Sequence, residues 1–462
     1  MAAIRLSDEQ MRGFIRNGYL AVKTGLPAEV HQDIWDETET VLETEGNPGN
    51  NLMARIPAIR KVFDDPAVDG ALAGVLGDNY YMHPHRHCHY RAPHSEGQQI
   101  HKDSFTKRRH HTRWILAMYY PQDTTVDMGP TAVIPGTQYY NWLRGPIGVE
   151  HRVDSTEGEV PMAVDAGTLL IVHYDIWHRG MPNESDKKRY MMKFMFTRME
   201  EPRRPSWDSR QSEWVPDGDD GHHAMWGHMW RWHYGATNGA VGRLGAEGTI
   251  PDLIRSLQVD SESTCLDAAY ELGAMGAAPV PALVDTLGHA SEAVRRNASY
   301  ALSAIGGPAV GALMEASQAS DPDTRSAAVE TLADIGLPAA EAVPLLTRAV
   351  EDESITVRRN AAEALGTAGQ RTSDGVAALA AALSAEDEFL RRNAALALAR
   401  IGSMAQDAVP ALTASLGDED RYVRGKAAHA LRRIGTPEAQ DALMHFLTTS
   451  QWCYSTTKDS MY

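Results

Sequence analysis

The C-terminal half of the chain repeats one short pattern, and this periodicity constrains the fold more than any other feature of the sequence. Six alanine-rich segments that end in glycine share it: TCLDAAYELGAMG from Thr264, AVRRNASYALSAIG from Ala293, TRSAAVETLADIG from Thr324, VRRNAAEALGTAG from Val357, LRRNAALALARIG from Leu390 and VRGKAAHALRRIG from Val423. Five of them carry an arginine at the same place, spaced by 30 or 33 residues: Arg295, Arg325, Arg358, Arg391 and Arg424. Shorter apolar segments such as VPALVDTL lie between them. Two short helices per unit cannot bury their apolar faces alone, so the units are expected to stack into an α-solenoid.

The repeated pattern resembles HEAT-like repeats of the short kind, over residues 250–447. The acid that recurs before the arginine, as in Asp352 and Arg358, is expected to tie the turn to the helix. Such an array predicts an extended surface, suited to a protein partner or to self-association.

The pattern of residue types changes upstream of the repeats. Residues 7–45 read as helices, with Ser7 as an N-cap and Gln10 three positions later. From Tyr80 to Thr197, β-branched and aromatic runs alternate with turn residues, which predicts a mainly antiparallel sheet structure. The join over residues 200–249 is rich in Trp, His and Gly and is interpreted as an apolar seam between the two halves.

A group of side chains in the strand-rich part has the composition of a metal centre. His101 and Asp103 are two residues apart, so strand alternation points both to one side. His178 ends a later apolar strand, and Arg189 opens the next one. Two His and one carboxylate, with three coordination positions left open, suit non-haem Fe(II). Arg189 offers a planar fork for the carboxylate of a co-substrate.

Around these residues the sequence resembles the phytanoyl-CoA dioxygenase family of Fe(II)/2-oxoglutarate oxygenases, over roughly residues 5–200. The opening segment LSDEQMRGFIRNGYLAV, the internal segment MGPTAVIPGTQYY and the eleven-residue step from His178 to Arg189 all carry the resemblance. It implies that His101, Asp103 and His178 bind iron, and that Arg189, Trp114 and Gln99 belong to the 2-oxoglutarate site. The family's serine two residues after the distal His is Gly180 here, so the contact at the other end of 2-oxoglutarate has no assigned residue.

The resemblance also implies a fold and a reaction. The fold is a double-stranded β-helix, a cupin-like jelly roll with N-terminal helices. The reaction consumes Fe(II)-bound 2-oxoglutarate and O2, and it hydroxylates an unactivated C–H bond with release of succinate and CO2. Related halogenases replace the metal-binding carboxylate by a small residue, so Asp103 favours hydroxylation over chlorination.

Two further polar segments are candidates for binding. His83, His85, His87 and His89 alternate along HPHRHCHYR and would line one face of a strand, either as a second metal site or as a polar pocket wall. The row is long for one ion, which favours the pocket wall. Substrate contacts are predicted for five cations, at Arg86, Arg91, Lys107, Arg108 and Arg109. The last three lie in KRRHHTR, which would accept an anionic group of the substrate.

Composition limits the partners and the cellular compartment that we expect for the protein. The net charge of −17 disfavours binding to nucleic acid or to an anionic membrane. No apolar run is long enough to span a bilayer, and no signal peptide opens the sequence. Three widely spaced cysteines give no disulfide framework, which is typical of a reducing compartment. We therefore expect a cytoplasmic protein.

The sequence thus predicts four parts and one leading function. The parts are an oxygenase-like domain (1–200), a connecting segment (201–249), the HEAT-like repeats (250–447) and a C-terminal tail (448–462). The leading function is hydroxylation of a small metabolite, anionic if the basic segment binds it, with the repeats as a scaffold. In the alternative, the repeats define an interaction protein whose oxygenase domain acts on, or is delivered to, a protein partner. In a third reading the barrel has lost its metal and serves as a sensor.

Overall fold

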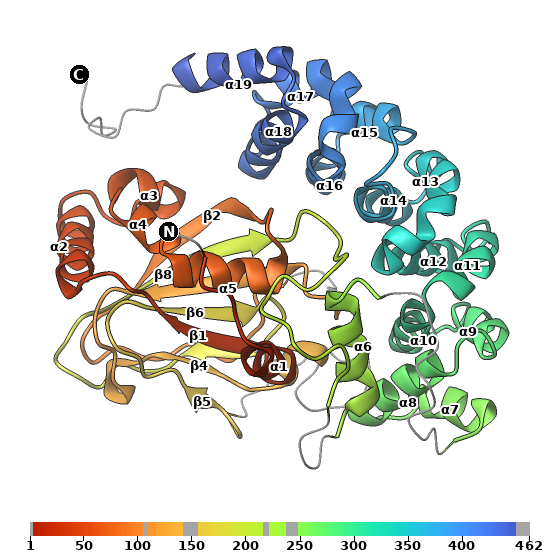
Figure 1. Cartoon of the computed structure of the whole chain (residues 1–462), viewed down its shortest axis with the longest axis horizontal. Helices are drawn as coiled ribbons and strands as arrows, with labels where there is room; N and C mark the ends of the chain where they lie inside the picture. The colour runs from red at the N-terminus through yellow and green to blue at the C-terminus, as the bar shows by residue number, and fades with distance from the viewer. Residues whose placement is uncertain (1–2, 105–109, 142–155, 216–220, 237–247, 450–462) are drawn as a thin grey trace.

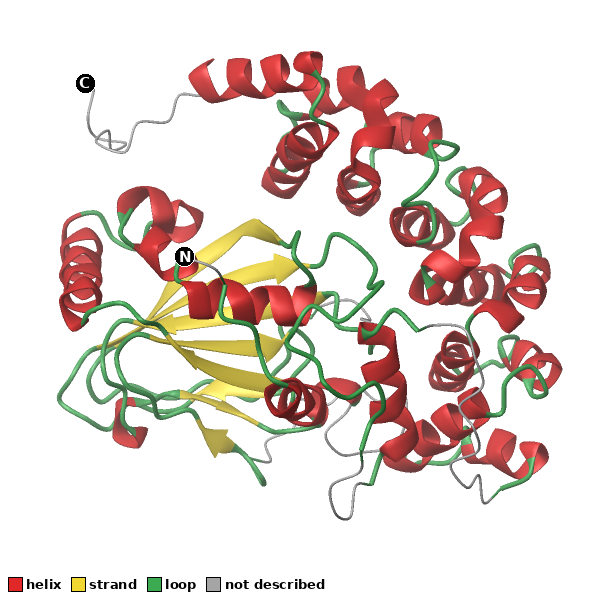
Figure 2. Cartoon of the chain, in the orientation of Figure 1, coloured by secondary structure: helices red, strands yellow, loops and turns green. Residues whose placement is uncertain are grey.

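The computed structural model has two parts, a strand-rich N-terminal part and a curved row of helices that wraps around one side of it (Figure 1). It describes residues 3–104, 110–141, 156–215, 221–236 and 248–449. Figure 2 shows the strands gathered in one part of the molecule and the row of repeated helices beside them. No helix in these described ranges is both long and apolar enough to cross a membrane.

Among its described residues, the N-terminal part has five helices and eight strands. Its helices are α1 (Asp8–Asn17), α2 (Ala28–Thr44), α3 (Leu52–Arg55), α4 (Ile59–Phe63) and α5 (Pro66–Leu76). Its strands are β1 (Tyr19–Lys23), β2 (Tyr81–Arg91), β3 (Trp114–Tyr120), β4 (Thr131–Val133), β5 (Val160–Pro161), β6 (Thr168–His173), β7 (His178–Gly180) and β8 (Arg189–Thr197). Short 3-10 turns lie at Gly49–Asn51, Val126–Met128 and Thr137–Tyr139.

The strands form two antiparallel sheets, as the sequence predicted. The larger sheet has the order β1-β6-β3-β8-β2, and the smaller has the order β5-β4-β7. Tyr120 of the larger sheet donates a hydrogen bond to Thr131 of the smaller sheet at 2.9 Å, so this face of the larger sheet is the interior of the barrel. Along β8, Arg189, Lys193 and Thr197 share that interior face by strand alternation.

The opposite face of the larger sheet packs against the N-terminal helices. Phe63 of α4 contacts Phe194 of β8 edge-on, with ring centroids 4.7 Å apart. His31 of α2 hydrogen-bonds to the Tyr119 hydroxyl at 2.7 Å. These contacts settle which side chains of β8 point outward and which point into the barrel.

The predicted helix start at Ser7 is also confirmed. Its side chain accepts from the backbone of Gln10, whose side chain accepts from the backbone of Ser7 in return. This capping box begins α1 where the sequence placed it.

In the described ranges 221–236 and 248–449, the helical part has α6, in the connecting segment, and thirteen further helices. These are α6 (His223–His233), α7 (Ile250–Ser256), α8 (Glu262–Ala274), α9 (Val280–Thr286), α10 (Glu292–Ile305), α11 (Val310–Ala316), α12 (Pro322–Ile335), α13 (Val343–Ala349), α14 (Ile355–Thr367), α15 (Val376–Ala382), α16 (Glu388–Ile401), α17 (Val409–Ser415), α18 (Arg421–Ile434) and α19 (Pro437–Thr449). Additional 3-10 turns lie at Gly307–Ala309, Leu337–Ala342 and Gly402–Ala408. The six repeated segments form α8, α10, α12, α14, α16 and α18, which lie on the concave side that faces the barrel (Figure 1).

The recurrent arginine links successive repeats. Arg358 donates to the backbone carbonyls of Asp352 and Glu353, which close its own turn. The carboxylate of Asp352 pairs instead with Arg325 of the preceding repeat, at 3.0 Å. Arg358 thus ties its helix to the turn at Asp352, as expected, but through the backbone carbonyl, while the carboxylate of Asp352 bridges two repeats.

The connecting segment forms an apolar seam, in line with its composition. Trp230 and Trp232 of α6 are fully buried. Trp232 stacks on His111 of the barrel with centroids 4.6 Å apart, and α6 also packs against α1 and α8. Arg113 beside it pairs with Glu201 and with Asp334 of α12, at 2.8 Å each, so a buried ion-pair network ties the barrel to the middle of the array.

The far end of the array also contacts the barrel. The hydroxyl of Tyr422 on α18 hydrogen-bonds to His85 of β2 at 2.7 Å, and His429 stacks on Tyr81 with centroids 4.1 Å apart. Gly425 makes this approach feasible, because a Cβ atom at this position would lie 2.9 Å from Pro84. The array is thus docked on the barrel at its middle and near its C-terminal end.

Candidate metal centre

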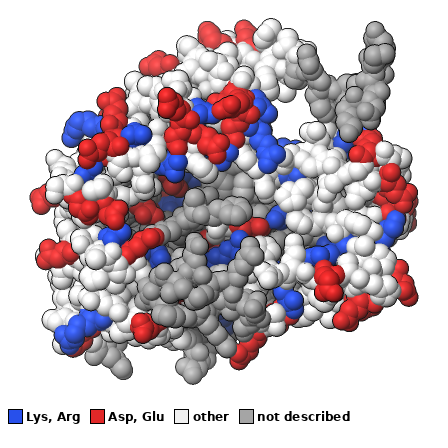
Figure 3. Space-filling model, turned by 180° about the vertical axis from the view of Figure 1, so that it is seen from behind, with Lys and Arg blue, Asp and Glu red and all other residues white. Residues whose placement is uncertain are grey.

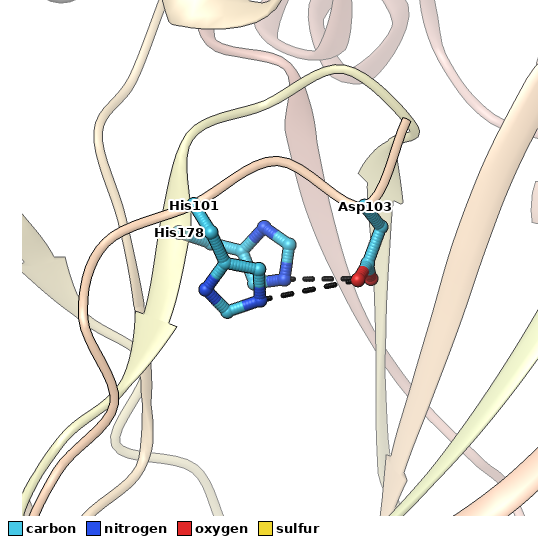
Figure 4. Close-up of side chains that lie close together, drawn as sticks. All are labelled: His101, Asp103 and His178. Carbon is cyan, nitrogen blue, oxygen red and sulfur yellow. Dashed lines mark ion pairs between the residues drawn. The ribbon is translucent and has the colours of Figure 1, made fainter. Parts of the chain in front are cut away.

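His101 and His178 are held side by side by their own backbones. The amide of each residue donates to the carbonyl of the other, at 2.9 Å in both directions, and the two ring centroids are 4.6 Å apart. Residues paired in this way across antiparallel segments project their side chains to the same side. The two imidazoles therefore converge although they are far apart in the sequence (Figure 4).

The orientation of both rings is fixed by backbone carbonyls. Nδ1 of His101 lies 2.9 Å from the carbonyl oxygen of Gln99, and Nδ1 of His178 lies 3.0 Å from that of Ile176. A carbonyl can only accept, so each Nδ1 carries the proton and Nε2 is left with a free lone pair. This is the arrangement that metal-binding histidines use, in which the second nitrogen orients the ring.

Asp103 completes the group. Its carboxylate oxygens lie 3.9 Å from Nε2 of His101 and 3.6 Å from Nε2 of His178, which is too long for hydrogen bonds. All three ligand atoms lie within 4.8 Å of one another, and within the described ranges this is the group of His, Cys, Asp or Glu that could hold a metal ion. Two lone pairs and a carboxylate that surround a common space fit a cation, and two His with one carboxylate suit Fe(II).

Lys193 lies next to this group, and the sequence prediction did not include it. Its Nζ is 2.8 Å from Oδ2 of Asp103, and the lysine is buried. Burial acts to raise the pKa of Asp103, but His178 and Lys193 outweigh it and hold this pKa well below its usual range. The carboxylate is therefore ionised, as a metal ligand must be.

Arg189 is buried at the other end of β8. Its Nη2 donates to the carbonyl of Gly129 at 2.7 Å, and its Nη1 donates to that of His89 at 3.3 Å. Gly129, in the MGPTAVIPG segment, has φ +69°, and a Cβ atom there would lie 2.6 Å from the carbonyl oxygen of Met181. Glycine is thus required where this segment passes the Arg189 fork.

A large cavity opens on the side of the metal group away from Arg189. It has a volume of about 820 Å3 and lies between the barrel and the concave side of the helical array. His85, Trp114, Asp175 and Met195 line it from the barrel. Met195 follows Lys193 on the interior face of β8, so Arg189, Lys193 and Met195 mark three levels along one strand, with Met191 between the first two.

Trp114 lies at the cavity and not beside Arg189. It pairs with Thr197, at the end of β8 opposite to Arg189, and its ring lies 4.7 Å from that of His83. That Trp114 belongs to the 2-oxoglutarate site stays a prediction, for a side chain that the structure places at the cavity. Gln99 orients His101 through its backbone carbonyl, and its side chain is exposed.

Arg91 fills the space next to Gly180. It pairs with Arg189 in the ladder of β2 and β8, so it also faces the interior. A Cβ atom at Gly180 would lie 2.7 Å from Nη2 of Arg91 and 3.0 Å from Oε1 of Gln98. The replacement of the family's serine by glycine thus coincides with an arginine that occupies the same space.

The other predicted substrate contacts are not brought together. Arg86 pairs with Phe194, whose ring packs on α4, so Arg86 lies on the outer face of the sheet and not in the barrel. Lys107, Arg108 and Arg109 fall outside the described residues. The histidine row of β2 follows the interior face as predicted: His85 to His87 and His87 to His89 are in ring contact, at 4.9 and 4.6 Å. Burial lowers the pKa of His87 to about 4 and that of His89 to about 2.

Lys102, between the two ligands, points away from them as alternation predicts. Its Nζ lies over the ring of Trp177, 5.6 Å from the centroid. Burial lowers the pKa of Lys102, and its charge interacts with Asp175, Glu262 and Arg296. The last two belong to α8 and α10, so side chains of the helical array reach the neighbourhood of the metal ligands. Only the folded arrangement, with its contacts across the two halves, reveals this.

Comparison with known proteins agrees with this geometry. The family model for phytanoyl-CoA dioxygenase (PhyH) matches residues 14–191, and the model for HEAT repeats matches residues 312–389, 342–406 and 376–454. No curated protein matches the chain.

Similar solved structures include the non-haem α-ketoglutarate-dependent carbocyclase SnoK of nogalamycin biosynthesis. The two sequences are 17% identical, the match covers 42% of this chain and 85% of SnoK, and the TM-score is 0.35. The epimerase SnoN, in complex with Fe3+, α-ketoglutarate and nogalamycin RO, is 15% identical in sequence. The match covers 42% of this chain and 83% of SnoN, with a TM-score of 0.36. HygX from Streptomyces hygroscopicus, with nickel and 2-oxoglutarate bound, is 14% identical in sequence. The match covers 42% of this chain and 88% of HygX, with a TM-score of 0.35.

Residues 14–191 form a phytanoyl-CoA dioxygenase domain, an oxygenase domain dependent on non-haem iron and 2-oxoglutarate, and this chain joins that domain to HEAT repeats.

Proposed function

We propose that the chain hydroxylates an unactivated C–H bond of a small molecule bound in the cavity between the barrel and the HEAT repeats. One 2-oxoglutarate and one O2 would be consumed with each substrate R–H, and R–OH, succinate and CO2 would be formed. Iron, when bound by His101, Asp103 and His178, supplies the oxidising chemistry.

The observation that carries this proposal is the order of side chains along β8. Arg189 stands at one end, Lys193 contacts the ligand Asp103 in the middle, and Met195 lines the cavity beyond it. A keto acid seated on Arg189 and a substrate in the cavity would therefore approach the metal group from opposite sides. This separation is what a reaction between two bound molecules requires.

The protein's own residues have distinct parts in this proposal. Arg189 would seat the distal carboxylate of 2-oxoglutarate, since its fork is already oriented by the carbonyls of Gly129 and His89. The carbonyls of Gln99 and Ile176 hold the protons of both imidazoles at Nδ1. The walls of the cavity, from the barrel and from the array, would limit the access of water to the reacting C–H bond.

The alternative of an interaction protein has less support. The concave side of the array faces the barrel and is docked there at its middle, through Asp334, and near its C-terminal end, through Tyr422. A protein partner would have to use the convex side of the array, which lies away from the cavity (Figure 1). We therefore favour a small-molecule substrate.

The test is O2-dependent formation of succinate from 2-oxoglutarate by the Fe(II)-loaded full chain. We expect turnover by the wild type and its loss in His101→Ala. His445→Ala is the control, because His445 is exposed on α19. Equal succinate formation by wild type and His101→Ala would contradict the proposal, and so would a wild type that binds iron and forms none.

A further inference from the structure

The cavity has two walls of different origin. The barrel supplies one through His83, His85, Trp114 and Met195, and the inner helices of the HEAT array supply the other. Its volume of about 820 Å3 is in the range of sites that enclose small organic molecules. The array therefore does more than stand beside the barrel, because without it this space would be an open surface.

Four cations of the outer wall come from one position of the repeat. Three of the repeated segments contain two adjacent arginines near their beginning. The first of these arginines donates hydrogen bonds to the turn of its own repeat, as Arg391 does to the carbonyls of Ala385 and Glu386. The second arginine lines the cavity, and this is so at Arg296, Arg359 and Arg392. Lys426 holds the same position in the last repeat and also lines the cavity.

Phe389 stands between two of these arginines. The guanidinium carbons of Arg359 and Arg392 lie 4.9 and 4.8 Å from the centre of its ring. Phe389 is 40% exposed and lines the cavity. A large apolar ring left this exposed inside a cavity is available to the flat face or edge of a ligand.

Several buried polar atoms of the lining have no hydrogen-bond partner among the described residues. They are Nε of Arg296, Oδ2 of Asp175 and Nε2 of His173. Arg296 is 7% exposed, and its ion pair with Glu262 has a length of 3.8 Å, beyond hydrogen-bond distance. Buried polar groups are nearly always satisfied in folded proteins, so unsatisfied ones in a cavity point to a ligand that supplies the partners.

The unsatisfied atoms are of both kinds, since Nε of Arg296 donates and Oδ2 of Asp175 accepts. The charges are mixed as well, because the lining contains seven Arg and Lys and six Asp and Glu side chains. Lys and Arg also alternate with Asp and Glu over the face seen in Figure 3. A simple anion would leave the acceptors unsatisfied, and an acyl chain would leave both kinds unsatisfied. Hydroxyl groups satisfy donors and acceptors alike.

We infer that the concave side of the HEAT array is the outer wall of the substrate site and that Arg296, with Asp175 opposite, recognises a polyhydroxylated small molecule of sugar or polyol type. This inference rests on the proposed oxygenase function and deepens it. It replaces the expectation of an anionic substrate, which depended on Lys107, Arg108 and Arg109.

The experiment uses the full chain with Fe(II), 2-oxoglutarate and O2, and three panels of probes. One contains uncharged oligosaccharides and polyols, one their phosphorylated counterparts, and one long-chain acyl thioesters. We expect members of the first panel to increase succinate formation and to yield a product heavier by one oxygen. Stimulation confined to the phosphorylated or acyl probes, or by none of the three panels, would overturn the inference about substrate class.

Variants of the outer wall test its role in recognition. Arg296→Gln is expected to raise KM for the stimulating probe about tenfold, as loss of a charged hydrogen bond does. Phe389→Ala is expected to raise this KM several-fold. Because Phe389 is partly exposed, this variant should fold, and it replaces Arg296→Gln in the test if that variant does not fold. Arg348→Gln is the matched control, because Arg348 lies exposed on the outer helix α13.

The outcomes separate the inference from the proposed function. A wild type that forms no succinate in the absence or presence of probes would defeat both. If the wild type does form succinate, but folded Arg296→Gln and Phe389→Ala variants keep the wild-type KM, only the inference that the array forms the outer wall of the substrate site would be overturned. Binding of the probe to the metal-free protein, followed by calorimetry, provides a readout independent of turnover and should weaken in the same order.

Discussion

Buried Lys193, on the interior face of β8, forms an ion pair 2.8 Å long with half-buried Asp103, a ligand of the metal centre. Asp103 has a second oxygen that remains free for a metal, so the lysine orients the carboxylate without taking its place. A side chain that orients a metal ligand is part of the site although it does not touch the metal.

Replacement of this lysine should therefore weaken metal binding. We expect Lys193→Met to lower the affinity for Fe(II) about 10–100-fold, the usual effect of losing a group that orients a ligand. Anaerobic titration with Fe(II) measures it. Lys188→Met is the control, because Lys188 precedes Arg189 and pairs with Glu39 and Glu43 outside the barrel. Unchanged or tighter binding in Lys193→Met would mean that the lysine merely competes with the metal.

Arg189 should determine the affinity for 2-oxoglutarate. Lysine lacks the planar fork, so Arg189→Lys is expected to lose about 1.5–3 kcal/mol of a charged, two-point contact. This corresponds to a rise of about 10–100-fold in KM for 2-oxoglutarate. Arg86→Lys, on the outer face of the same ladder, should leave this KM unchanged. An Arg189→Lys variant with wild-type KM would place the co-substrate elsewhere.

Gly425 should be intolerant of any side chain. Glycine to alanine in a helix ordinarily stabilises by about 0.5–1 kcal/mol, and Gly311→Ala on α11 should do so, since nothing lies within 4 Å of the added atom. Gly425→Ala should instead destabilise by about 1–3 kcal/mol, because its Cβ would lie 2.9 Å from Pro84. Urea denaturation compares the two. Equal effects of both variants would show that α18 does not pack on β2.

Stability should fall as the pH falls below about 6.5. Burial lowers the pKa of His173 to about 4 and that of His429 to about 3. In the unfolded chain each histidine takes up a proton near pH 6.5, so between pH 6.5 and 4 the unfolded state binds more protons than the folded state. Acidification through this window therefore favours unfolding, by about 1–2 kcal/mol per buried histidine at pH 5.

The melting temperature at pH 7.5 and pH 5 measures this dependence. His429→Gln should reduce the difference between the two values, whereas His445→Gln, at an exposed position, should leave it unchanged. A melting temperature that stays constant between these pH values would show that the buried histidines are protonated in the folded state.

Local patterns in the sequence predicted much of this molecule. The six repeats became six inner helices because the apolar period and the terminal glycine are local properties of each segment. His101 and Asp103 could be paired because residues two apart in an extended segment point to the same side, although His101 lies in an isolated β-bridge and Asp103 in a bend and not in a strand. Lys193 could have been found in the same way, since it follows Arg189 by four residues in the otherwise uncharged strand RYMMKFMFT.

Contacts between the two halves could not be read from such patterns. The closure of the cavity depends on Tyr422 meeting His85 and on the space left by Gly425, positions more than three hundred residues apart. The placement of Trp114 depended on the register of β3 against β8, and that of Arg86 on the face of β2 covered by α4. Register and docking are set by long-range packing, which one-dimensional periodicity does not contain.

The central claim is that His101, Asp103 and His178 hold one iron that also receives 2-oxoglutarate, and anaerobic absorption spectroscopy tests it most directly. Addition of Fe(II) and 2-oxoglutarate to the wild type should produce a weak visible charge-transfer band, absent with Fe(II) alone and lost in His101→Ala. A wild type without this band, or a His101→Ala variant that retains it, would contradict the account.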